Sequence, residues 1–411
     1  MSAGNVVIVG ASLAGTRAAE ALRREGHEGP ITIVGAEAHR PYDRPPLSKQ
    51  VLAGSMPHDE AILRVDDSLD ADWRLSTRAT GLDLERRVIR VAPVPGGRDH
   101  SSDPGSEELA FDSLIIATGA HPRMLPGMSK IDGVHVLRTI DDCLALRGAL
   151  DGSPKVAVVG AGFIGSEVAS TSHRRGLDVT VIEALPVPLV RALGEEMGRR
   201  CARLHQDHGV KLRLGVGVGG LVGSSRVEGV RLEDGSAVPA DVVVIGVGVA
   251  PTTGWLEGSG VDLADGVVCD RWCRVLAGGR PIPGVVAAGD VARWEHPGFG
   301  GALRVEHWTN AVEQGWAAAT TLVRGGGEGG SAPYTPVPYF WSDQYETKIQ
   351  FVGWDGPQVL VVEGSLDDDR FVAAYGREGR LVGALAFNRA ARVMAYRKMI
   401  ESGTEFPPPT P

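Results

Sequence analysis

Two stretches of similar sequence decide the fold that we expect. Residues 6–15 read VVIVGASLAG, and residues 156–165 read VAVVGAGFIG. In each stretch an apolar strand directly precedes the glycines, and a helix of small residues directly follows them. Glycines at such a turn remove the side chains that would keep a pyrophosphate away from the backbone N–H groups of the helix N-terminus. Two copies in one chain predict two dinucleotide sites, and hence electron transfer between two dinucleotides.

The first copy predicts a site for an adenosine-containing dinucleotide. Glu37 follows the next strand, 27 positions after Gly10, where its carboxylate can accept hydrogen bonds from ribose hydroxyls. Ser12 stands where the middle glycine of the pattern is usual. The alternative is a Rossmann-like turn that binds no phosphate. The candidate binding residues of this copy are Gly10, Ser12, Leu13, Ala14, Gly15 and Glu37.

The second copy keeps all three glycines and predicts a nicotinamide site. Glu183 lies 23 positions after Gly160, and its carboxylate would repel a 2′-phosphate. NADH is therefore expected over NADPH, although Arg191 could reach round to a phosphate. The candidate binding residues are Gly160, Gly162, Phe163, Ile164, Gly165, Glu183 and Arg191.

Each copy later reaches an apolar strand that ends on glycine, at residues 112–119 and 241–246. We expect the chain to cross between domains there, which places further candidates near the cofactors. These candidates are Ala117, Thr118, Gly119, Gly246 and Gly248. The strand at 285–290 is expected to return to the first sheet and to make the first domain discontinuous.

The amino-acid composition excludes several classes of function. The 411 residues include 42 basic and 51 acidic side chains, a net charge of −9, which argues against non-specific binding to nucleic acid or anionic membranes. No apolar run reaches the ~18 residues of a membrane span, and the N-terminus enters a strand at once, so we expect a cytoplasmic protein. The four cysteines form no Cys-x-x-Cys motif. Cys269 and Cys273 are expected to be buried structural thiols, with a metal or disulfide role as the alternative. No metal site is predicted.

Four further motifs carry a family resemblance. They are RPYDRPPLSK at residues 40–49, Ala288-Gly289-Asp290, VEHWTNA at 305–311 and PYFWSDQ at 338–344. Together they closely resemble the oxygenase-coupled, NADH-dependent ferredoxin reductases, over nearly the whole chain.

The resemblance implies an α/β fold with two Rossmann-like dinucleotide-binding domains, as in glutathione reductase, plus an α+β C-terminal interface domain. The expected domains are an FAD domain (1–113 and 246–322), an NADH domain (114–245) and the interface domain (323–411). Within the last, residues 325–333 are read as a flexible linker, residues 349–362 and 371–387 as β-rich, and residues 389–401 as a helix. Residues 93–108 are expected to form an exposed hairpin loop.

The resemblance also implies residue roles. Lys49 would lie near the reactive edge of the isoalloxazine, with Glu167 paired to it and Trp308 close to the flavin; these three are the predicted catalytic residues. The rigid proline-rich context of Lys49 supports this role, and a merely solvated lysine is the alternative. Packing in a core is the alternative for Trp308 and Trp341. The further cofactor contacts that the resemblance implies are Arg44, Lys49, Arg138, Gly289, Asp290, Glu306, His307, Trp308 and Trp341.

The cysteine pattern favours one route for the electrons. No cysteine precedes Cys143, so a thiol relay of the disulfide-reducing type is not expected, and reduced flavin would pass electrons singly to a ferredoxin. The resemblance implies that this ferredoxin, of [2Fe–2S] or related type, serves a cytochrome P450 or a ring-hydroxylating oxygenase. Arg293 and Arg304 could steer it, with the basic residues of the final helix as a weaker choice. A reductase of a small acceptor or of rubredoxin, and a redox-signalling flavoprotein, remain the alternatives, and the chain is expected to be a monomer or a homodimer.

Overall fold

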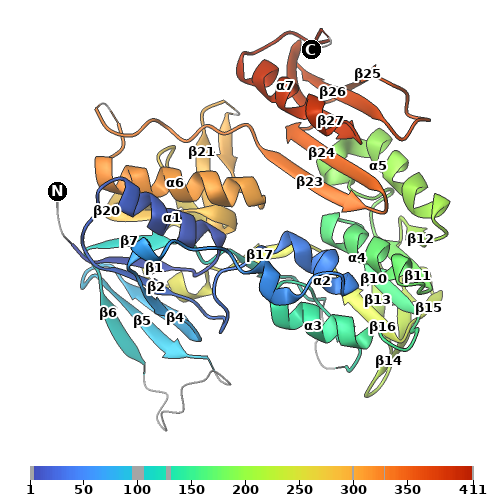
Figure 1. Cartoon of the computed structure of the whole chain (residues 1–411), viewed down its shortest axis with the longest axis horizontal. Helices are drawn as coiled ribbons and strands as arrows, with labels where there is room; N and C mark the ends of the chain where they lie inside the picture. The colour runs from blue at the N-terminus through green and yellow to red at the C-terminus, as the bar shows by residue number, and fades with distance from the viewer. Residues whose placement is uncertain (1–3, 95–105, 126–130, 299, 328, 410–411) are drawn as a thin grey trace. The chain divides into compact units, whose positions relative to one another are not determined.

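The computed structural model describes residues 4–94, 106–125, 131–298, 300–327 and 329–409. The chain forms two compact units (Figure 1). Unit 1 comprises Met1–Asp43, Ile62–His121 and Ala250–Pro338, and unit 2 comprises Arg44–Ala61, Pro122–Val249 and Tyr339–Pro411. No helix among the described residues is both long and apolar enough to cross a membrane.

Unit 1 is built on a sheet whose centre is parallel. The strand order is β22-β21-β18-β19-β20-β7-β1-β2-β3. The strands are β1 (Val6–Val9), β2 (Ile31–Val34), β3 (Asp72–Arg74), β7 (Ser113–Ile116), β18 (Val267–Cys269), β19 (Arg274–Ala277), β20 (Arg280–Ala287), β21 (Ala292–His296) and β22 (Gly301–Leu303). Strand β20 pairs in parallel with β7, with Val285 opposite Leu114, so the predicted return of this strand to the first sheet is confirmed.

Helices α1 (Leu13–Arg24) and α6 (Trp308–Arg324) lie side by side against this sheet (Figure 1). They approach closely at Gly315, where a Cβ would lie 2.6 Å from the carbonyl oxygen of Ala14. A separate antiparallel sheet contains β4 (Thr77–Asp83), β5 (Val88–Pro93) and β6 (Glu107–Ala110). Short 3-10 turns are η3 (Asp67–Leu69), η4 (Gly254–Leu256) and η5 (Gly289–Val291). Most of the predicted hairpin loop at 93–108 lies outside the described residues.

The first part of unit 2 repeats the same plan. Its parallel sheet has the order β12-β11-β10-β16-β9, and Val156 lies opposite both Val179 and Val242, as Val6 lies opposite Ile31 and Ser113 in unit 1. The strands are β9 (Val134–His135), β10 (Val156–Val159), β11 (Val179–Glu183), β12 (Lys211–Leu214) and β16 (Val242–Ile245), with a second sheet of β13 (Val218–Gly223), β14 (Val227–Leu232) and β15 (Ala237–Pro239). The short strands β8 (Ala120–Pro122) and β17 (Val249–Pro251) lie where the chain passes between the units.

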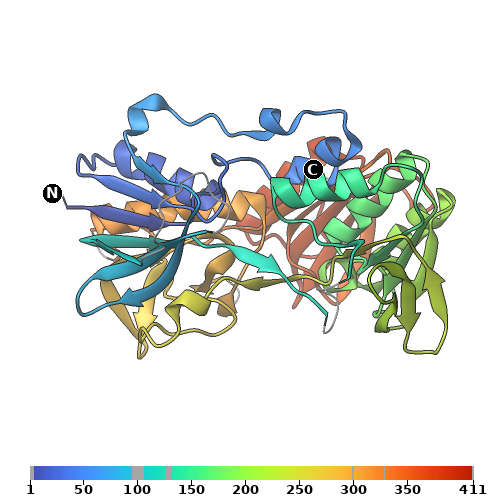
Figure 2. The ribbon, with the colours of Figure 1, turned by 90° about the horizontal axis from the view of Figure 1, so that it is seen from below.

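The helices of this part are α2 (Gln50–Ala53), α3 (Ile140–Ala149), α4 (Phe163–Arg174) and α5 (Val190–Asp207), with 3-10 turns η1 (Pro45–Ser48) and η2 (His58–Ala61). Helix α2, drawn in blue, lies beside the green helices α3 and α4 (Figures 1 and 2). Residues 44–61 therefore belong to the compact unit that holds the second glycine turn, although they follow the first turn in sequence.

The C-terminal part of unit 2 is an antiparallel sheet with a helix. The sheet has the order β23-β24-β27-β26-β25, and its strands are β23 (Tyr339–Gln344), β24 (Thr347–Gly353), β25 (Gln358–Glu363), β26 (Phe371–Arg377) and β27 (Arg380–Phe387), followed by α7 (Ala390–Glu401). The predicted β-rich segments and the final helix are confirmed. The side chains of Phe371 and Phe387 stack in its core with ring centroids 4.7 Å apart.

The described residues of the predicted linker at 325–333 make specific contacts with one another and with Trp272. The amide of Ser331 donates to the carbonyl of Gly325 at 2.8 Å, and the indole of Trp272 donates to the carbonyl of Ser331 at 3.0 Å. A Cβ on Gly326 would lie 2.8 Å from the Trp272 ring. Glycine is needed at this position because the backbone passes close to an indole ring. A glycine-rich composition alone does not distinguish such close packing from a flexible segment.

Candidate functional site

The two glycine turns have matching geometry. Gly10 has φ +126° and Gly160 has φ +100°, a backbone region that favours glycine. A Cβ on Gly10 would lie 2.0 Å from the carbonyl oxygen of Ala117, and a Cβ on Gly160 would lie 2.3 Å from that of Gly246. Each turn therefore passes directly against the end of the neighbouring parallel strand, which brings the predicted residues Ala117 and Gly246 to the turns.

The last glycine of each turn sets the contact between helix and turn. A Cβ on Gly15 would lie 1.9 Å from the carbonyl oxygen of Gly10, and a Cβ on Gly165 would lie 2.0 Å from that of Gly160. A backbone carbonyl cannot move out of the way as a flexible side chain can. Only glycine therefore allows α1 and α4 to begin so close to the preceding strands.

The residues before the two helices leave the first turn of each helix open. Ser12 and Gly162 are the N-caps of α1 and α4, and neither forms a side-chain cap hydrogen bond within the described part of the chain. At Gly162 a Cβ would meet no described atom within 4 Å. Helix amides without a side-chain cap fit a pyrophosphate, because it accepts hydrogen bonds from such amides and is stabilised by the positive end of the helix dipole.

Phe163 and Ile164 begin helix α4. The Phe163 ring packs on Phe340 with centroids 4.4 Å apart, whereas Ile164 is 45% exposed. Of these two predicted residues, Ile164 is therefore left accessible at the start of α4, whereas Phe163 is used in packing.

The two predicted acids lie at the ends of corresponding strands. The Glu183 carboxylate accepts hydrogen bonds from the amides of Ala161 at 2.7 Å and Leu185 at 2.9 Å. Glu183 is therefore tied to the second glycine turn by backbone amides, a detail that the sequence pattern did not indicate. Glu37 is half-buried and accepts a hydrogen bond from the Tyr42 hydroxyl.

Arg191 lies in the first turn of α5 and is exposed. Two residues earlier, the Leu189 amide donates to the carbonyl of Ala161 at 3.1 Å, within the second glycine turn. Glu183 therefore contacts this turn directly, whereas the chain before Arg191 contacts it through Leu189.

The loop after β20 lies against the first glycine turn. Gly289 has φ +78°, and a Cβ there would lie 2.9 Å from the Cβ of Ala14. The Gly289 amide donates to the Gln314 side chain at 2.9 Å. Gly289 is therefore tied to α6 and lies beside Ala14 in the first turn of α1, and Asp290 is the next residue. Gln314 is a supporting residue that no motif indicated.

The start of helix α6 holds further predicted residues. The Trp308 indole donates to the Asp43 carboxylate at 2.8 Å, and the residue is half-buried. Burial lowers the pKa of His307, the N-cap of α6, to about 4, and the nearby Asp290 carboxylate only partly offsets this. The His307 imidazole is therefore neutral at pH 7.

Arg304 does not present a free positive charge. Its guanidinium is 9% exposed and bonds to the Glu306 carboxylate at 2.6 Å, the Asp290 carbonyl at 3.1 Å and the Asp265 carboxylate at 3.3 Å. Arg293 is more exposed, at 34%, and lies 3.7 Å from Asp265. Of the two arginines predicted to steer a partner, Arg293 is therefore the more accessible. Arg304 and Glu306 instead hold the loop that contains Asp290.

The Lys49–Glu167 pair suggested by the resemblance is present, and it is buried. Lys49 Nζ lies 2.7 Å from Glu167 Oε2, with the two side chains 12% and 3% exposed. The same ammonium donates to the carbonyl of Pro45 at 3.1 Å. Glu167 also accepts hydrogen bonds from the hydroxyls of Ser48 and, at 2.7 Å, Ser342. The two serines were missed, since nothing in their local sequence marks a partner more than a hundred residues away.

Arg44 and Arg138 meet in unit 2. The Arg44 guanidinium donates to the Arg138 carbonyl, and the Arg138 amide donates to Asp142 at 3.0 Å, beside the capping box of α3. Trp341 stacks on Tyr339 with ring centroids 6.0 Å apart.

The remaining predicted residues lie close in sequence to the points where the chain leaves one unit and enters the other, after His121 and after Val249. The Thr118 hydroxyl donates to the Thr252 carbonyl at 2.8 Å, and Gly119 and Gly248 have φ +65° and +96°. Both glycines therefore occupy backbone turns that other residues rarely adopt.

All four cysteines are free and buried, which confirms the predicted burial of Cys269 and Cys273. Burial raises the pKa of the Cys143 thiol to about 11 and that of the Cys201 thiol to about 12, and burial also raises the pKa values of Cys269 and Cys273. Thiols of this kind are not nucleophiles at pH 7. Among the described residues, no cluster of histidine, cysteine and carboxylate side chains could hold a metal ion.

Comparisons with known proteins agree with this geometry. Residues 4–315 match the family described as pyridine nucleotide-disulphide oxidoreductase, and residues 339–410 match the one described as reductase C-terminal. Rhodocoxin reductase of Rhodococcus erythropolis is 36% identical over 98% of this chain and 90% of that protein. The ferredoxin–NAD(+) reductase component of the anthranilate 1,2-dioxygenase system of Burkholderia cepacia is 35% identical over 98% and 95%. The crystal structure of the covalent putidaredoxin reductase–putidaredoxin complex gives a TM-score of 0.88 at 30% identity, covering 97% of this chain and 93% of that chain.

Proposed function

This chain belongs to the pyridine nucleotide-disulphide oxidoreductase family, and on that premise we propose that it is an NADH-dependent ferredoxin reductase that contains FAD. Hydride would pass from NADH to FAD, and single electrons would then pass to a [2Fe–2S] or related ferredoxin. The observation that carries the proposal is the matching geometry of two uncapped glycine turns in a chain whose cysteines are all buried. Relatives named as ferredoxin–NAD(+) reductase components support the choice of acceptor.

We assign FAD to the turn in unit 1. The amides at the start of α1 would bind its pyrophosphate, Glu37 its ribose, and Asp290 the ribityl or phosphate end. This assignment is supported by the close approach of Gly289, the residue before Asp290, to Ala14 in the first turn of α1. The resemblance adds Arg44, Lys49, Arg138 and Trp308 as flavin contacts.

We assign NADH to the turn in unit 2. The amides at the start of α4 would bind its pyrophosphate, and Glu183 its adenosine ribose. Since backbone amides orient the Glu183 carboxylate toward the turn, a 2′-phosphate there would meet a fixed negative charge. NADH is accordingly the expected donor, with Arg191 as the residue that could relax this preference.

Bound FAD supplies the chemistry that accepts two electrons together and releases them singly. The chain contributes alignment and charge. Lys49 offers an ammonium that is held by the Glu167 carboxylate and the Pro45 carbonyl, so it cannot swing into water. A buried, oriented charge acts more strongly than a solvated one, because little water screens it. We propose that Lys49 stabilises negative charge that develops on the flavin.

The ferredoxin would serve a cytochrome P450 or a ring-hydroxylating oxygenase, and we propose a cytoplasmic location, which the free thiols support. The test combines the purified protein with NADH under anaerobic conditions and adds a [2Fe–2S] ferredoxin. We expect NADH-dependent reduction of cytochrome c that requires the ferredoxin. Rapid turnover with a small acceptor and no carrier protein would instead favour the small-acceptor alternative, and a long-lived reduced complex with little turnover would favour a signalling flavoprotein.

A further inference from the structure

The Glu167 carboxylate is a junction of three chain segments. It lies on α4, beside the second glycine turn, and it binds Lys49 and Ser48 from the segment of η1 and α2. Its second oxygen accepts a hydrogen bond from Ser342 of β23 at 2.7 Å. Ser342 is fully buried, so water cannot replace this hydroxyl. The C-terminal sheet therefore contributes a donor directly to the carboxylate that holds Lys49.

A second residue of β23 orients that hydroxyl. The Gln344 side-chain amide donates to the Ser342 oxygen at 3.2 Å, and Gln344 is also fully buried. A hydroxyl has one hydrogen, and since its oxygen accepts from Gln344, that hydrogen is left for Glu167. The two residues form a short chain that ends on the carboxylate, and such chains strengthen each member by polarisation.

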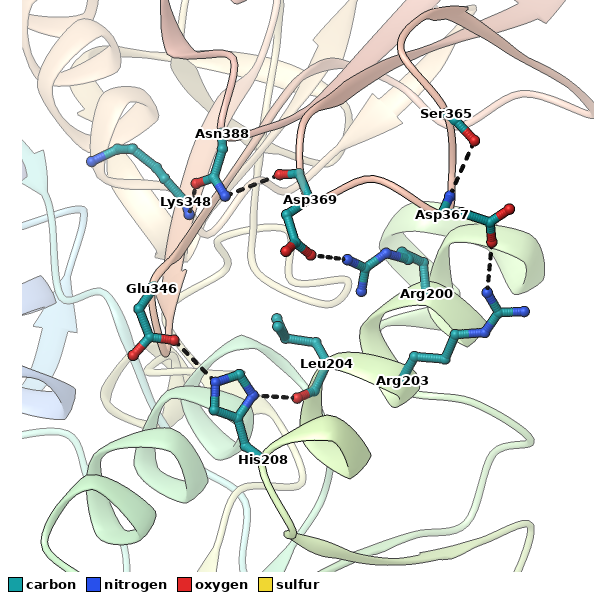
Figure 3. Close-up of polar contacts among 10 residues, drawn as sticks. All are labelled: Arg200, Arg203, Leu204, His208, Glu346, Lys348, Ser365, Asp367, Asp369 and Asn388. Carbon is teal, nitrogen blue, oxygen red and sulfur yellow. Dashed lines mark hydrogen bonds and ion pairs between the residues drawn. The ribbon is translucent and has the colours of Figure 1, made fainter.

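The position of β23 is fixed by contacts that do not involve Glu167. The amide of Tyr345, directly after β23, donates to Ser170 on α4 at 2.6 Å. Further along, α5 and its C-cap His208 are tied to the C-terminal sheet by three polar contacts (Figure 3). Arg200 pairs with Asp369 at 2.6 Å, Arg203 pairs with Asp367 at 3.5 Å, and a ring nitrogen of His208 lies within hydrogen-bond distance of the Glu346 carboxylate, at 3.0 Å. Ser342 is thus presented to Glu167 by a strand that other contacts hold in place.

We propose that Ser342, oriented by Gln344, is a positioning residue: its hydroxyl offsets part of the negative charge of Glu167, and so determines how strongly that carboxylate offsets the positive charge of Lys49. This inference rests on the proposed function, in which Lys49 lies beside the flavin. The hydroxyl dipole places a partial positive charge against the carboxylate. Without it the carboxylate shows more negative charge to its surroundings, and adding electrons to a nearby flavin becomes less favourable.

The test compares Ser342→Thr with Ser342→Val in the full-length protein loaded with FAD. Threonine and valine have side chains of nearly the same shape, and only threonine keeps the hydroxyl. At a fixed poising potential we expect the ratio of reduced to oxidised flavin to fall about threefold or more in the valine variant relative to the threonine variant. The rate of flavin reduction by NADH should fall with it, while the KM for NADH stays unchanged.

Ser170→Ala is the control that shows what happens when the C-terminal sheet is held less firmly against α4. It removes a contact between the same helix and the same strand without touching Glu167, so it should lower Tm and leave the flavin potential unchanged. If either Ser342 variant fails to fold, Ser342→Ala against wild type gives the same comparison with a smaller side chain.

Equal flavin potentials in the threonine and valine variants would overturn the inference, provided that wild type is reduced by NADH. A flavin potential that shifts by the same amount in Ser170→Ala would also overturn the inference, since weaker attachment of the C-terminal sheet would then explain the shift. A wild-type protein that holds no FAD, or that NADH does not reduce, would refute the proposed function itself.

Discussion

Two substitutions in the second glycine turn can distinguish an effect on stability from an effect on cofactor binding. Gly162 and Gly165 stand three residues apart, yet a Cβ at Gly162 would meet no described atom within 4 Å, whereas a Cβ at Gly165 would lie 2.0 Å from the carbonyl oxygen of Gly160. We therefore predict that Gly162→Ala and Gly165→Ala act on different properties, although the chemical change is the same.

The expected magnitudes follow from those distances. At Gly165 the backbone must shift by about 1 Å to admit a methyl group, and overpacking of this kind costs ~1–3 kcal/mol. Such a cost lowers Tm by about 2–4 °C per kcal/mol in a domain of this size. At Gly162, with φ −74° and ψ −174°, alanine is unstrained, so Tm should change little or rise slightly.

The effect of Gly162→Ala should appear in NADH binding. Its methyl group would stand where the pyrophosphate approaches the amides of α4. Loss of one hydrogen bond to a charged group costs ~1.5–3 kcal/mol, which corresponds to a tenfold or larger rise in the KM for NADH. FAD content should stay at the wild-type level, because we assign FAD to the other glycine turn, in unit 1.

The assays are thermal unfolding, flavin content and steady-state reduction of ferricyanide over a range of NADH concentrations. Gly162→Ala with wild-type KM would refute the assignment of this turn to NADH. Gly162→Ala as unstable as Gly165→Ala would refute the steric argument.

Four further outcomes follow from the site. Glu183→Gln should narrow the preference for NADH over NADPH at least about tenfold, measured as the ratio of kcat/KM values, because a like-charge contact is removed; an unchanged ratio would exclude Glu183. Asp290→Ala should purify with substoichiometric FAD, and a fully yellow protein would count against its role. Arg293→Glu should raise the KM for ferredoxin and spare ferricyanide reduction, whereas Arg304→Glu should impair both, since Arg304 holds the Asp290 loop. Burial lowers the pKa of His205 from 6.5 to about 4, so the unfolded state binds more protons below pH 6.5, and this one histidine should contribute about 2 kcal/mol to the loss of stability between pH 7 and pH 5. His205→Gln should lose less stability over this range than wild type does, measured by denaturant unfolding at each pH.

Much of the fold could be predicted because it depends on local pattern. Gly10 and Gly160 are placed by their neighbours in sequence, and the return of β20 follows from an apolar strand that ends on glycine. The Lys49–Glu167 pair could be anticipated only through family resemblance, since the two residues are far apart in the chain.

What could not be predicted depends on side chains that meet from distant segments. Ser342 reaches Glu167 across 175 positions, and no spacing rule links a serine in a strand to a carboxylate in a helix. The backbone amides that hold Glu183 depend on the detailed path of the turn. Arg304 looked like an exposed cation because a sequence shows charge but not burial.

The central claim is that electrons enter from NADH, pass to FAD and leave without a cysteine relay. The most direct measurement is the visible spectrum of the protein during an anaerobic NADH titration, followed by addition of oxidised [2Fe–2S] ferredoxin. The account predicts that NADH bleaches the flavin band and that ferredoxin restores it, with the same result after thiol-blocking reagent has been added. A colourless protein that cannot be reconstituted with FAD, or a flavin that ferredoxin reoxidises only before the thiols are blocked, would contradict it.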